Sequence, residues 1–358
     1  MRTIRILFWT VLVFLVLIIL YFSTIIIQAV TSDYQPDKIT QLPINGQPEF
    51  ADISDTVFTF LSWNIGYSGL GAEMDFFYDG GKQVHPPAGN VKKYNSGILN
   101  FLQSSDTIDF LLLQEVDKNS KRTGKQNYVK MVQSKMPGYT ASFGLNYKVK
   151  YVPLPFLNPL GKIEMGQMNL SKFEPASSQR VSYYSAYSWP KHLFMLDRCF
   201  IVSTFPLEYG KNLVVINTHN SAYDTSGKLR QQEMPVIRDF MLKEFEAGNY
   251  VIAGGDWNQN PPKYDLNEIE PGYHAVHREA LDRTLFPDDW QIAYYPHHPT
   301  NRAIDAPFSK EKTEVTIIDY FIVSPNLQVE KVKTLSQEFE YSDHEPVFLK
   351  ISLKNTDM

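Results

Sequence analysis

The chain has 358 residues, which is enough for one large domain or two small ones, and its 34 lysines and arginines face 39 acidic residues for a net charge of −5. Its hydrophobic content of 43% and aromatic content of 14% predict a substantial buried core. Proteins that bind nucleic acid usually have clusters of lysine and arginine, and this sequence has no such cluster. Its absence counts against a processive nuclease but does not exclude one. The single cysteine, Cys199, rules out an internal disulfide and reads as a small buried apolar residue.

The first predicted element is a membrane-spanning helix. Residues 6–30 contain no charged side chain and consist mostly of Ile, Leu, Val and Phe. A helix of about 20 such residues crosses the hydrocarbon core of a bilayer. The alternative is a cleaved signal peptide, whose apolar region spans only about 7 to 15 residues before small residues at the cleavage site. The greater length favours an uncleaved anchor.

The flanks of this helix predict its orientation. Arg2 and Arg5 precede it, and Asp33 and Asp37 follow it. Because positive flanks tend to stay in the cytoplasm, we expect residues 1–5 to be cytoplasmic and everything after the anchor to be extracytoplasmic. Residues 31–54 carry several prolines without a sustained periodicity, and we expect them to form a tether that gives the domain reach from the membrane.

Residues 55–358 are predicted to form one α/β domain. Runs rich in β-branched and aromatic residues predict strands at 57–63, 110–114, 200–203, 213–217, 250–253, 315–323 and 347–353. Apolar positions at helical spacing predict helices at 90–104 and 230–246. Near-continuous apolar strands indicate sheets that are covered on both faces.

Six short polar motifs stand at the edges of these runs. They are Ser62-Trp63-Asn64-Ile65-Gly66, Leu113-Gln114-Glu115-Val116-Asp117, Asn217-Thr218-His219, Gly255-Asp256-Trp257-Asn258, Ile318-Asp319-Tyr320 and Ser342-Asp343-His344-Glu345-Pro346. Together, in this order and over residues 56–353, they resemble the endonuclease/exonuclease/phosphatase superfamily of metal-dependent phosphoesterases, with features of its deoxyribonuclease and neutral sphingomyelinase branches. The resemblance implies a four-layered α/β sandwich, in which two mixed β-sheets pack together and helices flank them.

The resemblance also implies a metal site. Glu115 ends a buried strand and matches the family's metal carboxylate, with Asn64 beside it and Asp343 holding the metal or its waters. Oxygen ligands of this kind suit Mg²⁺, with Mn²⁺ as the alternative. Glu115 alone would read as a salt-bridged residue at a strand end, and the other motifs make the metal role the better interpretation.

The remaining motifs imply catalytic groups. His344 matches the general base, since imidazole exchanges a proton near neutrality, and Asp319 matches the carboxylate that fixes its tautomer. Asp256 would orient the attacking water, Asn258 would bind the phosphate, and His219 would contact the scissile phosphate. Each motif by itself also fits an ordinary turn after a strand.

Three further residues are candidate phosphate contacts. Arg180 and Arg198 could bind phosphate oxygens in bidentate fashion, although each fits a surface ion pair equally well, and Asn217 belongs to the His219 motif.

The predicted function is therefore a membrane-anchored, Mg²⁺-dependent phosphoesterase. Aromatic and proline-rich stretches at 147–159 and 183–190 fit either loops packed on the core or the rim of an apolar or membrane-facing pocket. In the second case a phospholipid-like ester is one substrate class. An extracytoplasmic nuclease acting on DNA or RNA is the first alternative, and a binding module without catalysis is the second. No protein partner follows from the sequence.

Overall fold

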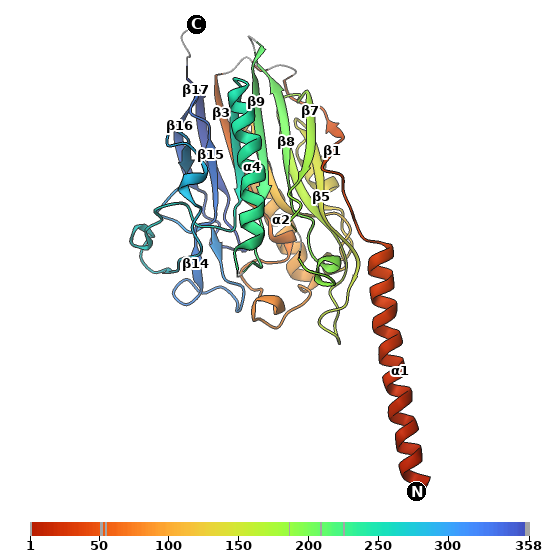
Figure 1. Ribbon diagram of the computed structural model, residues 1–358. Coiled ribbons are helices and arrows are strands. Elements are labelled where there is room, and N and C mark those ends of the chain that lie inside the picture. The colour runs from red at the N-terminus through yellow and green to blue at the C-terminus, as the bar shows by residue number, and fades with distance from the viewer. Residues whose placement is uncertain are drawn as a thin grey trace.

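The computed structural model describes residues 2–50, 53, 56–185, 187–207, 210–224 and 226–354. Two seven-stranded sheets pack face to face (Figure 1). Helices α2 (Ala88–Ser104) and α3 (Tyr128–Lys135) cover the outer face of one sheet, and α4 (Lys228–Glu246) covers the outer face of the other. The predicted four-layered α/β sandwich is confirmed. The predicted boundary at residues 54 and 55 lies outside the described residues.

Three of the six polar motifs lie at strand ends of the first sheet. Its order is β1 (Ile39–Gln41), β7 (Ser177–Ser182), β8 (Cys199–Pro206), β9 (Asn212–His219), β10 (Tyr250–Asp256), β15 (Asp319–Val323) and β12 (Gln291–Ala293). Strands β9 and β10 run parallel, so their carboxyl ends meet at one edge.

The second sheet is also mixed. Its order is β16 (Leu327–Thr334), β17 (Val347–Leu353), β3 (Val57–Asn64), β4 (Phe110–Asp117), β6 (Gly161–Ser171), β5 (Thr140–Val152) and β2 (Ile44–Gly46). Strands β3 and β4 are parallel neighbours. The polar motifs at residues 62–66 and 113–117 therefore lie side by side at one edge of this sheet.

The predicted strand at 315–323 is two strands. Its first part is β14 (Glu314–Thr316), which lies between β11 (His274–Ala275) and β13 (Asn301–Arg302) in a small separate sheet. The break has a local cause: the Asn260 amide donates to the carbonyl of Ile317, and the backbone N–H of Ile318 donates to the hydroxyl of Thr300. These side chains satisfy backbone groups that a neighbouring strand would otherwise pair.

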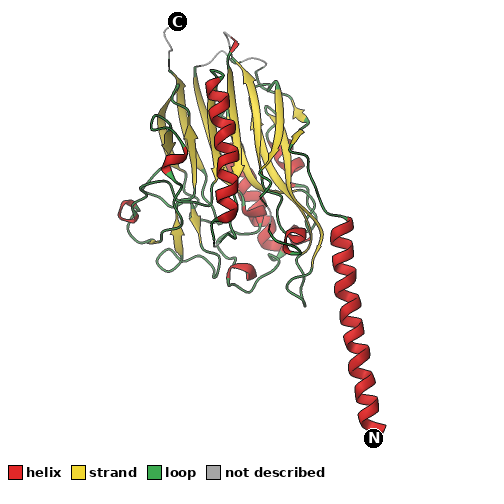
Figure 2. Cartoon of the chain, viewed as in Figure 1, coloured by secondary structure: helices red, strands yellow, loops and turns green. Residues whose placement is uncertain are grey.

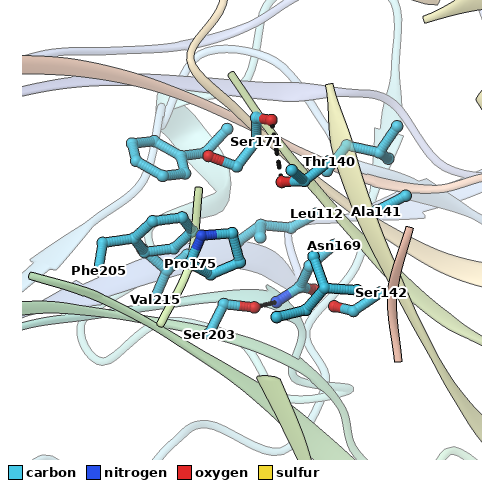
Figure 3. A pocket seen from close by; sticks show the side chains of 13 residues that line it. Leu112, Thr140, Ala141, Ser142, Asn169, Ser171, Pro175, Ser203, Phe205 and Val215 are labelled. Carbon is cyan, nitrogen blue, oxygen red and sulfur yellow. Dashed lines mark hydrogen bonds between the residues drawn. The ribbon is translucent and has the colours of Figure 1, made fainter. Parts of the chain in front are cut away.

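The space between the two large sheets is filled by aromatic and aliphatic side chains. The rings of Phe60 and Phe110 stack there with centroids 4.7 Å apart, and both side chains are buried. A small cavity beside them is lined by both sheets and bridged by the hydrogen bond from the Asn169 amide to Ser203 (Figure 3). It has room for about one water molecule, so it is a packing feature and no substrate site.

We expect Phe110→Ala to lower the free energy of unfolding by about 3–5 kcal/mol, because the surrounding sheets cannot collapse into the space left by the ring. Urea unfolding of the detergent-solubilised protein, followed by tryptophan fluorescence, measures this. Val57→Ala, at an exposed position of the same sheet, is the control and should change stability by less than about 0.5 kcal/mol.

Helix α1 (Arg2–Thr31) contains the predicted anchor and extends away from the domain (Figure 1). By length and composition it could cross a membrane, and a signal sequence would meet the same criterion. Most of its side chains are exposed, whereas Ile25 and Ala29 near its end are buried. The helix end therefore packs on the domain.

The tether predicted over 31–54 stays a prediction, and its central part forms two short strands. Residues 39–41 form β1 and pair with β7, and residues 44–46 form β2 and pair with β5. The edge strands of both sheets have free backbone donors and acceptors, and this segment satisfies some of them. Residues 39–46 thus tie the chain to both sheets immediately after α1.

Candidate active site

Predicted site residues line one cleft, together with residues of α1 and of the loops around it. Figure 2 shows that the loops gather at the end of the sandwich from which α1 departs. Seven of the predicted site residues line the cleft: Glu115, Arg198, His219, Asp256, Asn258, Asp343 and His344. Strand register explains part of this convergence, because Asp256 on β10 is paired with both His219 on β9 and Asp319 on β15. Gly255 permits the close approach of β9, since a Cβ atom there would collide with the carbonyl oxygen of Thr218.

His344 and Asp319 form a buried pair. The distance from His344 Nδ1 to Asp319 Oδ2 is 2.9 Å, and Asn301 Nδ2 lies 3.1 Å from His344 Nε2. An ionised Asp319 can only accept, so Nδ1 carries the proton and Nε2 of the neutral ring is an acceptor. Burial alone lowers the pKa of His344, but the carboxylates of Asp319 and Asp256 outweigh burial and raise that pKa well above its usual value.

Asp256 occupies the centre of the site. Its Oδ2 accepts a hydrogen bond of 3.0 Å from Asn64 Nδ2 and lies 3.7 Å from His344 Nε2. Its Oδ1 accepts a bond of 2.9 Å from the backbone N–H of Asn258. Burial raises the pKa of Asp256 to about 6, although the neighbouring His344 works in the opposite direction. The structure thus places Asn64, Asp256, Asn258 and His344 in one connected group.

His219 faces the same centre from β9. Its Nε2 lies 3.5 Å from Asp256 Oδ2 and 3.8 Å from Glu115 Oε1. Burial, with Arg198 and His344 nearby, lowers the pKa of His219 well below its usual value, so the ring is neutral at physiological pH. Arg198 donates to the backbone carbonyl of His219 at 3.3 Å and lines the cleft.

Glu115 reaches the cleft through an irregularity in β4. The pairing of β4 with β6 shifts between Leu113 and Val116, and Glu115 has a φ of 55°. A bulge of this kind redirects a side chain, and a non-glycine residue in the left-handed region stores about 1–3 kcal/mol of strain. Asn258 has a φ of 53°, so two of the predicted site residues share this strained conformation.

The donor set fits a divalent cation. Burial raises the pKa of Glu115 to about 7, and the nearby Asp343 adds to the shift. Burial also raises the pKa of Asp343. Carboxylates that oppose each other's ionisation would both gain from a cation, and the oxygens of Glu115, Asp343 and Asn64 are of the type that Mg²⁺ prefers. A second group of side chains could also hold an ion. It consists of Asp256, Asp319 and His344, and so includes the buried His344–Asp319 pair.

Two of the three candidate phosphate contacts lie away from the cleft. Arg180 is buried between strands, where its Nε and Nη2 donate to the carbonyls of Leu145 and Asp197 at 2.8 Å. Asn217 bonds to Gln114 and to the carbonyl of Leu113, so it joins the two sheets. Both side chains are buried and neither lines the cleft, so a contact of either residue with phosphate stays a prediction. Arg198 alone of the three lines the cleft.

The structure adds site residues that carry no recognisable sequence pattern. Asn301 meets His344 from a separate sheet, and nothing in its flanking sequence marks it. Arg122 lines the cleft beneath Glu115, bonds Asp117 through two nitrogens at 2.9 and 3.2 Å, and lies 3.5 Å from the Tyr67 ring centroid. Its charge opposes the upward shift of the Glu115 pKa.

We expect Arg122→Ala to lower the free energy of unfolding by about 3–5 kcal/mol, because it leaves the buried carboxylate of Asp117 without its ion partner. Urea unfolding in detergent measures the loss. Lys191→Ala, which removes an exposed cation of the same cleft, is the control, and an equal effect of both changes would contradict the buried-pair explanation.

Known proteins agree with the fold. The sequence profile of the Endonuclease/Exonuclease/phosphatase family matches residues 61–344, and the chain belongs to this family. Its members hydrolyse phosphoric esters and generally depend on a divalent metal, so the protein is a phosphoric ester hydrolase by class. No curated protein matches the sequence.

Solved structures share the fold at low identity. An endonuclease/exonuclease/phosphatase from Beutenbergia cavernae has 14% identity and a TM-score of 0.55 over 84% of this chain and 72% of that one. The 2',3'-cyclic phosphatase ANGEL2 has 15% identity and a TM-score of 0.54 over 88% and 99%. D. rerio TDP2, solved with a single-stranded DNA product, has 12% identity and a TM-score of 0.52 over 83% and 100%.

Proposed function

We propose that the protein is a membrane-anchored, Mg²⁺-dependent phosphoesterase in which His344 is the general base. The observation that carries the proposal is the meeting of the His344–Asp319 pair, Asp256 and Glu115 in one cleft. Mn²⁺ is the alternative ion. A binding module without catalysis has no need of a buried histidine whose tautomer is fixed by a buried carboxylate.

Each residue has a role in an in-line displacement. Asp319 holds the Nδ1 proton, so His344 Nε2 can accept a proton from a water that Asp256 orients on the far side of the phosphorus from the leaving group. The neutral His219, Asn258 and Arg198 donate to the phosphoryl oxygens as negative charge builds on them. A cation bound by Glu115, Asn64 and Asp343 would supply Lewis-acid polarisation of a phosphoryl oxygen.

Asp319→Asn gives a test with a defined sign. The Asp319 carboxylate raises the pKa of His344, and the base works only when it is neutral, so activity rises with pH through that pKa. Removing the charge lowers this pKa, and the acid limb of the rate profile should move to lower pH while the plateau falls by about 10²-fold or more because the tautomer is no longer fixed. An unshifted acid limb would contradict this role of Asp319.

The anchor assignment draws support from the cleft. Phe22, Ile25 and Ile26 of α1 form part of the cleft wall. If α1 were a leader peptide, its cleavage after export would remove this part of the cleft wall. The packing therefore favours a helix that is retained. With Arg2 and Arg5 on the cytoplasmic side, the catalytic domain lies outside the cytoplasm.

The charge of the cleft favours a small or lipid phosphoester over nucleic acid. Arg122 is tied to Asp117, Arg230 pairs with Glu279, and Arg302 donates to buried carbonyls. The cations of the described cleft wall are interspersed with carboxylates, whereas a nucleic-acid groove needs free cations along its length. A nuclease therefore remains the second candidate.

Hydrolysis by the full chain in detergent micelles, with Mg²⁺ or with EDTA, tests the proposal. The panel comprises a nitrophenyl phosphodiester, sphingomyelin, phosphatidylinositol phosphates, plasmid DNA and RNA. Metal-dependent turnover of a lipid or small diester is the expected result. Turnover of DNA or RNA alone would favour the nuclease, and turnover that EDTA leaves unchanged would reject the metal-dependent mechanism.

A further inference from the structure

The cleft has an apolar half that the phosphate chemistry does not use. Its walls come from the end of α1 and from the connection between β5 and β6. The residues are Phe22, Ile25 and Ile26 on the helix, Val152 at the end of β5, and Pro153, Leu154 and Leu160 on the connection. Glu115, Asp343 and His344 line the same continuous cleft. A water-soluble phosphoester would gain nothing from this apolar surface.

The length of α1 places this apolar half at the membrane surface. A helix rises 1.5 Å per residue, so a hydrocarbon core of about 30 Å takes about 20 residues. Counted from Ile6, the first residue after Arg5, the core ends near Ile25. This is the turn at which α1 joins the cleft wall. The cleft is therefore open at the level where lipid headgroups begin.

The β5–β6 connection meets the helix at the same level. The rings of Tyr21 and Phe156 lie with centroids 5.7 Å apart. Leu154, Phe156 and Leu157 are 56%, 60% and 93% exposed, which is costly in water and favourable in a bilayer. We name residues 153–159 the apolar loop.

Side chains typical of a membrane interface surround this region. Trp189 is 66% exposed, and Lys191 beside it is exposed and lines the cleft. Lys148 and Lys150 are exposed next to the last turn of α1. Aromatic rings and lysines are enriched where protein meets headgroups, and lysines attract anionic lipids.

We propose that the substrate is a membrane-resident amphiphilic phosphoester that enters the cleft from the bilayer between α1 and the apolar loop. Its hydrocarbon part stays against Phe22, Ile26 and Leu154, and its phosphate reaches the Glu115 and His344 site. This inference rests on the proposed function and names its substrate class. The apolar loop inserts into the same leaflet and keeps the cleft mouth against the membrane.

Two matched diesters test the substrate class: hexadecyl nitrophenyl phosphate and methyl nitrophenyl phosphate, which share a leaving group and differ only in chain length. The full chain is assayed in phosphatidylcholine nanodiscs. The hexadecyl ester should have a kcat/KM at least about tenfold higher, because the chain occupies the apolar half. Equal values would overturn the inference and leave the proposed function standing, whereas hydrolysis of neither ester would reject the proposed function itself.

The double variant Phe156→Ser, Leu157→Ser, which changes two exposed side chains outside the cleft wall, separates membrane docking from chemistry. It should lower turnover of the hexadecyl ester by about tenfold or more and leave the methyl ester within about twofold. Val57→Ser, an exposed apolar position on β3, is the control and should change neither. A variant that loses both activities equally would contradict the docking role.

Fluorescence quenching tests insertion independently of activity. Leu157→Cys can be labelled selectively with an environment-sensitive dye, because the native Cys199 is fully buried. Lipids brominated along the acyl chain should quench a dye at 157 and leave a dye at Val57→Cys unquenched. An unquenched dye at 157 would overturn the proposed insertion.

Discussion

Replacing His344 with alanine is expected to lower kcat/KM for a nitrophenyl phosphodiester by about 10³-fold at neutral pH. The imidazole is held by Asp319 on one side and faces Asp256 on the other, so its removal takes away the positioned group that accepts the water's proton. The fold should survive, because the side chain serves the site and contributes little to the core packing. Melting temperature and Mn²⁺ affinity are measured beside activity.

His297→Ala is the matched control for this loss. His297 is exposed, bonds the carbonyl of Glu268, and does not line the cleft. Its removal should leave kcat/KM within about twofold of the wild type. If His344→Ala retained wild-type activity, the assignment of the general base would be rejected; if it unfolded, the more conservative His344→Gln would replace it.

The sequence predicts those parts of the fold that depend on local pattern. Strands such as 213–217 and 250–253 are continuous apolar runs, and the helix at 230–246 has its apolar residues at helical spacing, so each is visible without the rest of the chain. The strands β1 and β2 were not predicted, because an edge strand of three residues is defined by the neighbour it pairs with. The break at residues 317 and 318 depends on Asn260 and Thr300, which lie far away in sequence.

The same division holds for the site. Residues at the ends of parallel strands, such as His219 and Asp256, could be predicted to meet because register brings strand ends together. Arg180 and Asn217 were placed near phosphate by residue type and motif, and only tertiary packing shows that both side chains are buried and bonded to groups outside the cleft. Asn301 and Arg122 could not be found from sequence, because their roles depend on contacts with His344 and with Asp117.

The second large effect is expected from Glu115→Gln, which keeps the shape of the side chain and removes its charge. If Glu115 binds the metal, Mg²⁺-dependent hydrolysis should fall by about 10³-fold, which corresponds to the several kcal/mol that a bound cation contributes to the transition state. Binding of Mn²⁺, followed by paramagnetic resonance, should weaken in parallel. Glu314→Gln removes an exposed carboxylate of the same cleft and should affect neither measurement.

The melting temperature is a second readout for Glu115→Gln. It is expected to rise without metal, whereas the activity is expected to fall. The pKa of Glu115 is raised to about 7 by burial and by Asp343, so ionising this carboxyl opposes folding when no metal is present. In EDTA at pH 8, where the wild-type carboxylate is charged, Glu115→Gln should therefore melt at a higher temperature than the wild type. The difference should shrink as the pH falls below about 7 and vanish below about pH 4, where this carboxyl is protonated in both the folded and the unfolded state.

Mg²⁺ at pH 8 should then raise the melting temperature of the wild type and have little effect on the variant, because a ligand stabilises only the state that binds it. The strained backbone at Glu115 and the opposed carboxylates would together be a cost that metal binding offsets. If the variant were destabilised in EDTA and gained as much from Mg²⁺ as the wild type, Glu115 would be a structural residue and the metal would lie elsewhere.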